Sequence, residues 1–294
     1  MTHSLFVQDY EIGVRGRLFK RATNKDEWQK DITDLPAFTK ALRAKSRIDI
    51  FDFLERPAPS PVKHAAYWEW ESFAVLPISS YAHWYGKQIN EGTRRAIRRA
   101  AQAGVEVRTV PFNDELVAGI CGIYNESPVR QGRRFPHYRK PFEQVKKENA
   151  TYPDKAEFLG AYYKGELLGF LKLVCMETYA VPMQILSLIS HRDKKVTNAL
   201  LGKGVELCAQ KGLANLYYYR WQEESGLGEF KRRNGFERVD LRRYYVPVSI
   251  AGSLALKWKL HRELHEVIPA RVAGPLKQMR ARVLAAGRGS LFPR

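Results

Sequence analysis

The order of strand and helix signals between residues 156 and 248 constrains the fold of this chain most strongly. Two apolar runs, 158–163 and 167–176, are joined by Lys164-Gly165-Glu166, and this glycine turn predicts a β-hairpin. The signals that follow are a strand at 183–190, a helix at 196–211, a strand at 216–221, a short helix at 228–233 and a strand at 236–246. A hairpin followed by strand–helix alternation predicts an α/β fold with a mixed sheet and helices packed on it.

A second set of signals precedes residue 150. It comprises strands at 10–19, 48–53, 67–78 and 105–111, and helices at 26–44 (interrupted near Pro36), 81–103, 115–124 and up to about 149. Gly104 suits a left-handed cap at the end of the helix 81–103. Thr151-Tyr-Pro-Asp154 indicates a boundary, so we expect two halves, 1–150 and 151–249. A basic helical tail is expected at 250–294, with two helices separated near Pro269.

The chain carries a large positive charge. Its 49 Lys and Arg against 31 Asp and Glu give a net charge of +18. Charge of this size favours polyanionic partners, namely nucleic acid, anionic lipid or a phosphorylated substrate. A basic surface that serves solubility alone is the alternative.

Neither the cysteines nor the N-terminus indicates export. Cys121, Cys175 and Cys208 are odd in number and widely spaced, which indicates neither a zinc ribbon nor a redox motif. The histidines are scattered without ligand spacing apart from His261 and His265, so we expect no metal site. No signal peptide or long apolar span stands out, and we expect a cytoplasmic protein.

The segment after the third strand has the features of a phosphate site. A helix N-terminus presents unpaired N–H groups and a partial positive charge. Three basic side chains crowd the expected start of the helix at 196. The residues of this candidate donor site are Arg192, Lys194, Lys195, Val196, Thr197 and Asn198. A solvated basic loop before an ordinary helix is the alternative reading.

This order of elements resembles the GNAT acyltransferase fold. GNAT proteins carry Arg/Gln-x-x-Gly-x-Gly/Ala at this helix start, where the backbone grips the coenzyme A pyrophosphate. The matching positions here are Arg192, Lys195 and Thr197, so only the arginine fits. Side chains at the two small positions hinder close approach of a pyrophosphate, which weakens acetyl-CoA as the donor.

Three further segments resemble the FemABX family, which is built from two GNAT-like halves. They are TRRAIRRAAQAGVEV at 93–107, IYNESPVR at 123–130 and GLGEFKRRNGF at 226–236. The resemblance spans roughly residues 65 to 248. It implies transfer of an amino acid from aminoacyl-tRNA to an amine, without a covalent enzyme intermediate.

Three residues are candidates for the chemistry. Lys231 stands where many GNAT enzymes have a tyrosine general acid, and the FemABX pattern also has lysine there. Its positive charge would serve a phosphate or a developing oxyanion. Tyr219, at the end of an expected strand, and His191, in the basic turn, are the other two.

Arginines and aromatic residues outside this turn form a candidate surface for tRNA or the acceptor. The four arginines at 94–99 stand at i,i+4 spacing with few acidic residues near them. A basic, aromatic loop follows at 125–140. The candidate residues of this surface are Arg94, Arg95, Arg98, Arg99, Arg130, Arg133, Arg134 and Tyr138.

The sequence therefore predicts an N-acyltransferase with no tightly bound cofactor. We favour aminoacyl-tRNA as its donor, with acyl-CoA second. The acceptor is expected to be an amine on a peptide, a cell-wall precursor or a small molecule. Two alternatives stay open, a non-catalytic nucleic-acid-binding protein on the same fold and a membrane-surface acyltransferase of envelope or polysaccharide synthesis. In the latter, the amphipathic tail would provide peripheral membrane contact.

Overall fold

The chain divides into two compact units. The computed structural model describes residues 2–17, 19–25, 27–57, 64–221 and 226–262. The first unit comprises Met1–Glu69 and Arg242–Arg294, and the second comprises Trp70–Leu241. These units differ from the division expected at residues 150 and 249, because the chain enters the second unit within one strand and leaves it within another. That the protein contains two GNAT-like halves stays a prediction.

The second unit contains the mixed sheet predicted from the hairpin pattern. Its strands, in spatial order, are β5 (Tyr67–Pro77), β12 (Asn215–Arg220), β11 (Tyr179–Ser187), β10 (Glu166–Cys175), β9 (Ala156–Tyr163) and β6 (Glu106–Val110). All neighbouring pairs are antiparallel except β11 and β12, which are parallel. The mixed α/β class is therefore confirmed.

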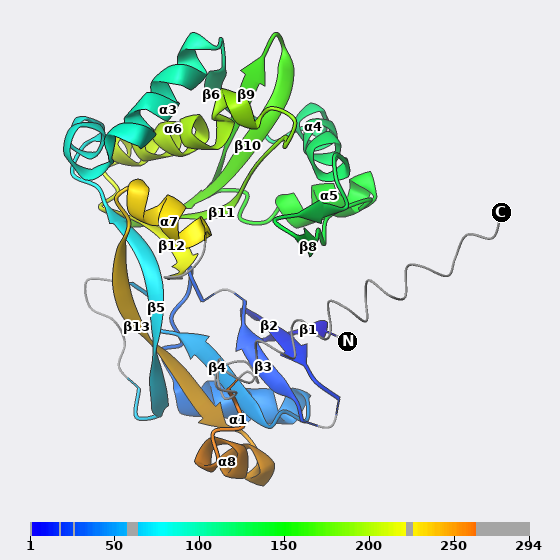
Figure 1. Ribbon diagram of the computed structural model, residues 1–294. Coiled ribbons are helices and arrows are strands. Elements are labelled where there is room, and N and C mark those ends of the chain that lie inside the picture. The colour runs from blue at the N-terminus through cyan, green and yellow to red at the C-terminus, as the bar shows by residue number, and fades with distance from the viewer. Residues whose placement is uncertain (1, 18, 26, 58–63, 222–225, 263–294) are drawn as a thin grey trace, which may run out of the picture. The chain divides into compact units, whose positions relative to one another are not determined.

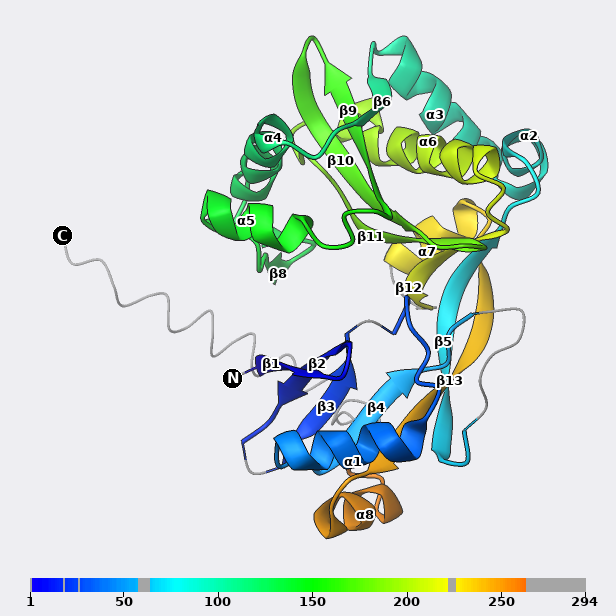
Figure 2. The ribbon, with the colours of Figure 1, turned by 180° about the vertical axis from the view of Figure 1, so that it is seen from behind.

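Helices cover both faces of this sheet (Figures 1 and 2). On one face α3 (Glu91–Gln102) lies beside α6 (Val196–Gln210), and α6 packs on Leu171 and Leu173 of β10. On the other face α4 (Asp114–Asn125) and α5 (Phe142–Asn149) pack around Phe170. The remaining elements are α2 (Tyr81–His83), the π-helix Trp84–Gln88, the 3₁₀ turn Arg192–Lys194, α7 (Gly226–Arg233) and a small hairpin of β7 (Val129–Arg130) and β8 (Arg133–Arg134).

The prediction of a single long helix at 81–103 is wrong, because α2, a π-helix and α3 share this range. The π-helix ends before Ile89, and Asn90 starts a new helix because its side-chain oxygen accepts a hydrogen bond from the Thr93 amide at 2.8 Å. Asparagine is among the best N-cap residues, so it favours a break here although apolar periodicity continues. The helix end at Gly104 is confirmed, with the glycine at a φ of 80°.

The first unit consists mainly of strands with one helix at its core. Its strands lie in the order β1 (Thr2–Val7), β2 (Tyr10–Arg15), β3 (Arg21–Asn24), β4 (Ile50–Leu54) and β13 (Glu237–Pro247), with β3 and β4 parallel. Phe38 and Leu42 of α1 (Leu35–Lys45) pack against Phe51 of β4 and Tyr244 of β13. The helix expected from residue 26 begins only at Leu35, after its cap Asp34. Of the predicted tail, α8 (Ile250–Lys257) is a helix, and the part around Pro269 lies outside the described residues.

A buried carboxylate joins three strands of this sheet. Asp52 of β4 is 1% exposed and accepts hydrogen bonds from Arg21 Nη2 at 2.6 Å and Thr23 Oγ1 at 2.7 Å. Arg243 of β13 lies 3.6 Å away. Burial raises the pKa of Asp52, but the hydrogen bonds and charges of Arg21, with Arg243 and Thr23, outweigh burial and hold it below its ordinary value. The ionised carboxylate therefore stabilises the fold above the ordinary carboxyl pKa, and this contribution is lost as the pH falls.

Asp52→Asn is expected to lower the free energy of unfolding by about 3–5 kcal/mol at neutral pH, because Arg21 loses its buried counter-charge, while Arg243 keeps its pair with Glu27. Urea denaturation measures the change. Asp240→Asn is the control, since Asp240 forms an exposed pair with Arg238, and such a pair contributes about 0–1 kcal/mol. Equal losses in the two variants would contradict the role given to Asp52.

Candidate functional site

The candidate site lies in the second unit, where the two parallel strands part. β11 and β12 are paired only at Tyr179–Asn215 and Ala180–Leu216. Beyond that point β11 stays paired with β10 as far as Ser187, whereas β12 continues beside β5. Backbone groups on the facing edges of the diverging strands need other partners, so this is where a ligand can pair with the sheet.

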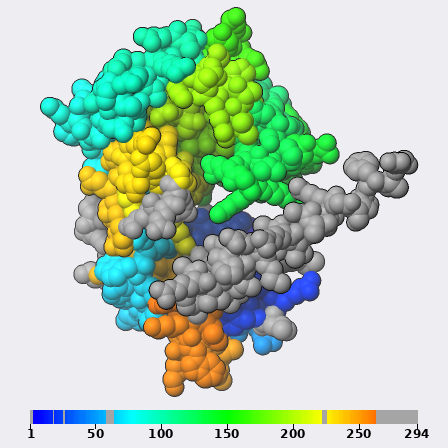
Figure 3. Space-filling model, viewed as in Figure 1, coloured from blue at the N-terminus to red at the C-terminus, as the bar shows by residue number. Residues whose placement is uncertain are grey.

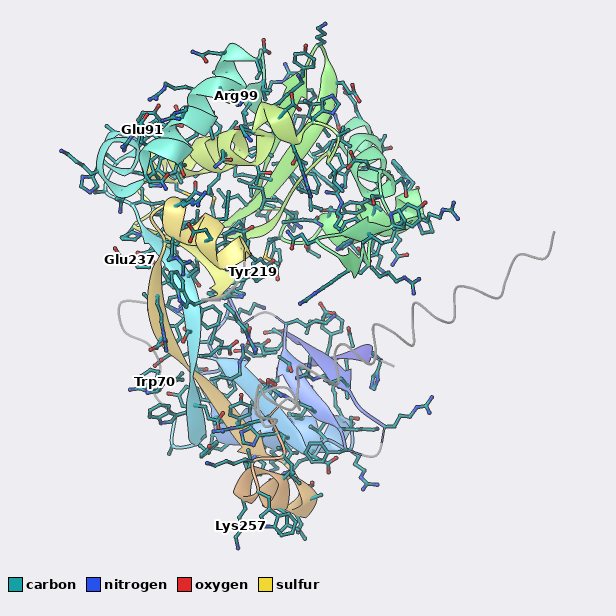
Figure 4. The ribbon with its side chains drawn as sticks, viewed as in Figure 1. Trp70, Glu91, Arg99, Tyr219, Glu237 and Lys257 are labelled. Atoms are coloured by element: carbon teal, nitrogen blue, oxygen red, sulfur yellow. The ribbon has the colours of Figure 1, made fainter. Side chains whose placement is uncertain are left out.

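Tyr219 bridges the diverging strands. Its hydroxyl donates a hydrogen bond to the Met183 carbonyl of β11 at 2.5 Å. The residue has a φ of 49°, in the left-handed region, next to an irregularity in the pairing of β12 with β5. A bulky residue in this region is strained, and such strain is concentrated at functional sites. Figure 4 shows Tyr219 at the end of β12, as expected of a candidate side chain.

The turn between β11 and α6 is held by a carboxylate that the sequence did not single out. Glu126, just after α4, accepts hydrogen bonds from the amides of Ile189 at 2.6 Å and Ser190 at 2.8 Å. The Ser190 hydroxyl also donates to it at 2.8 Å. Backbone amides that converge on one anion form an anion site, and here the protein's own carboxylate occupies that site.

Arg130 completes this carboxylate clamp. Its guanidinium lies 3.2 Å from Glu126 and donates to the carbonyls of Ser187 at 2.8 Å and Ile123 at 2.7 Å. Arg130, expected to contact tRNA or the acceptor, is therefore occupied in fixing the turn. An i,i+4 Glu–Arg pair at a helix end is the sequence signal that could have indicated the clamp.

The expected phosphate-binding residues surround the start of α6. Lys195 caps the helix with a φ of 55° and no side-chain cap bond, and Val196 is buried. Thr197 Oγ1 lies 3.1 Å from Ser187 Oγ, so this side chain fills the position where a GNAT motif has a small residue. Asn198, half-buried, donates its amide hydrogen to the Lys195 carbonyl at 3.0 Å.

The basic side chains of this turn differ in their solvent exposure and in their contacts. Arg192 is exposed. Lys194 lies over the Tyr163 ring, with its Nζ 4.3 Å from the ring centroid. His191 is half-buried, and its Nδ1 lies 3.1 Å from the Ser190 hydroxyl. Of the cationic residues at the turn, Arg192 is the one best placed to meet an anion from solvent.

Lys231 is a buried ammonium group. It is 0% exposed, its Nζ donates to the Arg220 carbonyl at the end of β12 at 2.8 Å, and it lies 4.8 Å from the centre of the Tyr218 ring. Burial lowers its pKa to about 8. No carboxylate pairs with it among the described residues. An ammonium of this kind is poised for proton transfer or for stabilising negative charge near neutral pH.

The arginines of α3 are more engaged than the sequence indicated. Glu91 pairs with Arg94 at 2.9 Å and Arg98 at 2.6 Å, and these contacts lower the pKa of Glu91 to about 2. Arg94 also donates to the carbonyls of Tyr85, Gly86 and Ile89. The expectation that these arginines lack acidic partners is wrong for Arg94 and Arg98. Arg95 and Arg99 are exposed, and Figure 4 shows Arg99 on α3.

The predicted tRNA or acceptor residues do not form one patch. Those of α3 lie on the α6 face of the sheet, whereas Arg133, Arg134 and Tyr138 follow α4 on the opposite face. Arg133 and Arg134 are exposed on β8. Arg133 pairs with the clamped Arg130 across the small hairpin. The structure thus brings the hairpin arginines to the turn before α6, and leaves the α3 arginines apart from them.

The thiols and acidic groups of the described residues indicate no other chemistry. Burial raises the pKa of Cys175 to about 11 and that of Cys208 to about 12, so neither is a ready nucleophile. Among the residues that the structure describes, no three His, Cys, Asp or Glu side chains gather as metal ligands.

No protein-family model and no curated protein sequence matches the chain. Solved structures do match it. L-PGS from Bacillus licheniformis has a TM-score of 0.57 at 15% identity, over 88% of each chain. FemX has a TM-score of 0.55 at 9% identity, over 87% of this chain and 90% of that chain. This chain has the fold of FemX and L-PGS. The C-terminal domain of a protein assigned as lysylphosphatidylglycerol synthetase from Agrobacterium fabrum is also similar, with a TM-score of 0.56 and 11% identity over 87% of each chain.

These similarities establish the fold. The GNAT-like fold of the FemABX kind, expected from three short segments, is therefore confirmed. The roles of Lys231, Tyr219, His191 and the basic turn stay predictions.

Glu126→Gln is expected to lower the free energy of unfolding by about 1.5–3 kcal/mol, because it weakens hydrogen bonds to a charged acceptor. Burial raises the pKa of Glu126, but the amides of Ile189 and Ser190 and the charge of Arg130 lower it further, so the net pKa lies below the ordinary value. The stabilisation is present above the ordinary carboxyl pKa and is lost as the pH falls. Thermal denaturation against pH should show the two proteins converging in acid, and a constant difference would argue against the clamp.

Proposed function

We propose that the protein is an N-acyltransferase that forms an amide on an amine acceptor, with aminoacyl-tRNA as its donor. The observation that carries the proposal is Lys231, a fully buried ammonium at the end of β12, on the fold of FemX and L-PGS. Lys231 lies on α7, and its acceptor Arg220 follows Tyr219 in β12, the residue that bridges the diverging strands. A positive charge in a water-poor setting acts strongly on nearby negative charge.

The chemistry needs no covalent enzyme intermediate. The acceptor nitrogen attacks the carbonyl carbon of the donor ester, a C–N bond forms, and the negative charge moves onto the carbonyl oxygen. The C–O bond to the leaving hydroxyl then breaks, and the amine proton is transferred to that oxygen. Lys231 is proposed to stabilise the oxyanion, and Tyr219 and His191 are candidates to position the donor or transfer the proton.

Three features favour aminoacyl-tRNA over acyl-CoA. Lys195 and Thr197 fill positions where a pyrophosphate would need close backbone approach. Glu126 already occupies two amides of the adjoining turn. The net charge of +18 and the exposed Arg133, Arg134 and Arg192 suit a long polyanion better than one pyrophosphate.

The acceptor is proposed only as a chemical class, an amine. Lysylphosphatidylglycerol, after which the Agrobacterium fabrum protein is named, is an aminoacyl lipid. For this chain we propose an amine on a peptide, a cell-wall precursor or a small molecule. The alternative is a protein that binds nucleic acid without catalysing a reaction. The exposed arginines of the hairpin, Arg133 and Arg134, also allow this function.

Lys231→Met is expected to reduce kcat by about 100- to 1,000-fold with little change in KM, because it removes charge that acts on the transition state. Single-turnover loss of the aminoacyl group from charged tRNA gives the rate. For the unaltered protein, the rate should fall as the pH rises through about 8, where Lys231 loses its proton. Lys231→Arg, which keeps the charge, should retain part of the rate and lose this pH dependence.

Lys172→Met is the matched control. Lys172 is 3% exposed, burial lowers its pKa to about 8, and it donates to the Asn149 carbonyl and the Thr151 hydroxyl. It lies against Phe158, on the face covered by α4 and α5. Its loss should cost stability and leave kcat within about twofold. Equal losses of kcat in the two variants would remove Lys231 from the mechanism.

The double variant Arg133→Gln, Arg134→Gln is expected to weaken tRNA binding and to reduce the slope of log affinity against log salt by about two. Fluorescence anisotropy over a salt series measures both quantities. The matched control is Arg95→Gln, Arg99→Gln, which removes two exposed arginines from α3 and should leave the slope unchanged. The opposite ranking would place the tRNA on the α3 face.

The donor itself is tested with acetyl-CoA and a charged-tRNA pool. Saturable tRNA binding with loss of the aminoacyl group supports the proposal. Tight CoA binding without any effect of tRNA would assign the protein to the acyl-CoA enzymes, and tRNA binding without turnover would favour the binding protein.

A further inference from the structure

Helix α8 in the first unit has almost no polar face. Its sequence, IAGSLALK, carries no charged residue before Lys257. A helix that is apolar on all sides is normally buried in protein or in lipid. In the described part of the chain α8 is covered on one side only.

The covered side is built for close contact. Gly252 approaches the first unit so closely that an added Cβ would lie 1.8 Å from the Asp49 carbonyl oxygen. Ala255 is 4% exposed and packs with Ile50 and Tyr245. The small residues at this side let the helix lie directly on the end of β4.

Both ends of α8 are fixed to the same unit. At the start, Ser249 caps the helix and its hydroxyl donates to buried Asp49 at 2.7 Å. After the end, the carbonyl of buried His261 accepts from Arg21 Nη1 at 2.9 Å, and Arg262 pairs with Glu69 at 2.8 Å. These contacts therefore determine the orientation of α8. They also determine which of its side chains face away from the first unit.

The outward side of α8 is a stripe of large apolar residues. Ile250 is 83% exposed, Leu254 44% and Trp258 64%, and their i,i+4 spacing places them on one side. Leu260, just past the helix, is 65% exposed. Packing of α8 on β4 does not require these residues, and adjacent exposed apolar side chains mark an interaction surface.

Cationic groups lie beside this stripe. Lys257 and Lys259 are exposed next to Trp258, and Figure 4 shows Lys257 on α8. Figure 3 shows α8 (orange) at the surface of the first unit. An apolar stripe with tryptophan and flanking lysines complements a bilayer interface with negatively charged headgroups.

We propose that the outward side of α8 docks the protein on a membrane that contains anionic phospholipid. Ile250, Leu254 and Trp258 enter the headgroup region, while Lys257 and Lys259 meet lipid phosphates. Among the described residues no helix has the length and apolar content to span a bilayer. A helix of this length supplies limited apolar area, so binding needs both the apolar and the electrostatic contribution.

The test is vesicle sedimentation of the full chain without any donor or acceptor. Vesicles of phosphatidylglycerol and phosphatidylcholine should bind the protein, and phosphatidylcholine alone should bind it at least about tenfold more weakly because the electrostatic attraction is lost. The triple variant Ile250→Ser, Leu254→Ser, Trp258→Ser should lose about tenfold or more of the binding to anionic vesicles. Its melting temperature should be unchanged, because the three side chains are exposed.

The matched control is the double variant Phe6→Ser, Trp70→Ser. These residues are 64% and 57% exposed and lie on β1 and β5, so the variant removes exposed apolar surface from elements other than α8. The control should bind vesicles as the unaltered protein does. In a separate measurement, lipids brominated near the headgroup should quench tryptophan fluorescence, and Trp258→Phe should remove most of that quenching.

Three results would overturn the proposal. They are equal vesicle binding by the triple variant and the control, equal binding to anionic and zwitterionic vesicles, and self-association of the unaltered protein that the triple variant abolishes. The last would assign the stripe to contact with a second copy. Since no substrate is present, failure here is distinct from failure of the proposed acyl transfer.

Discussion

The parting of β11 and β12 is the constraint on which the candidate site depends. Parallel strands in a sheet normally satisfy each other's backbone groups along their length, but this pair does so at only two positions. β11 is held by β10 and β12 by β5, so the two strands are drawn toward different neighbours. The strained Tyr219 and the clamped turn before α6 both lie beyond the last shared pair. Tyr219 gives the Met183 carbonyl of β11 a hydrogen-bond donor, and Glu126 gives the amides of the turn an acceptor.

Two buried lysines of the second unit, Lys172 on β10 and Lys231 on α7, differ in how many hydrogen-bond acceptors they meet. Lys172 has two oxygen acceptors, from a carbonyl and a hydroxyl, and aromatic rings around it. Lys231 has one carbonyl acceptor and one ring. An ammonium has three hydrogens to donate, so Lys231 keeps more unused donor capacity than Lys172. Both lysines are buried, so the number of acceptors, and not burial, is the feature that distinguishes Lys231 from Lys172.

The sequence predicted what local signals encode. The glycine turn at Lys164-Gly165, the cap at Gly104 and the helix at 196 each depend on a few neighbouring residues, and all appear in the structure. Short polar strands such as β3 have no such signal, because their register comes from partners elsewhere in the chain. The clamp of Glu126 on Ile189 and Ser190 joins residues more than sixty positions apart, and no spacing rule relates them. The bounds of the two compact units also have no local signal, since β4 and β13 pair across most of the chain.

The discontinuity of the first unit has a consequence for synthesis. The whole of the second unit lies in the chain between β4 and residues 243–247, the part of β13 that pairs with β4. During translation the second unit can become complete as a continuous stretch, while the earlier-made β4 waits with one edge unpaired and Asp52 without Arg243. An unpaired edge is a template for wrong pairing, and distant pairings form slowly. The nascent first unit is thus the part of this protein with the greatest need of protection until the final strand emerges.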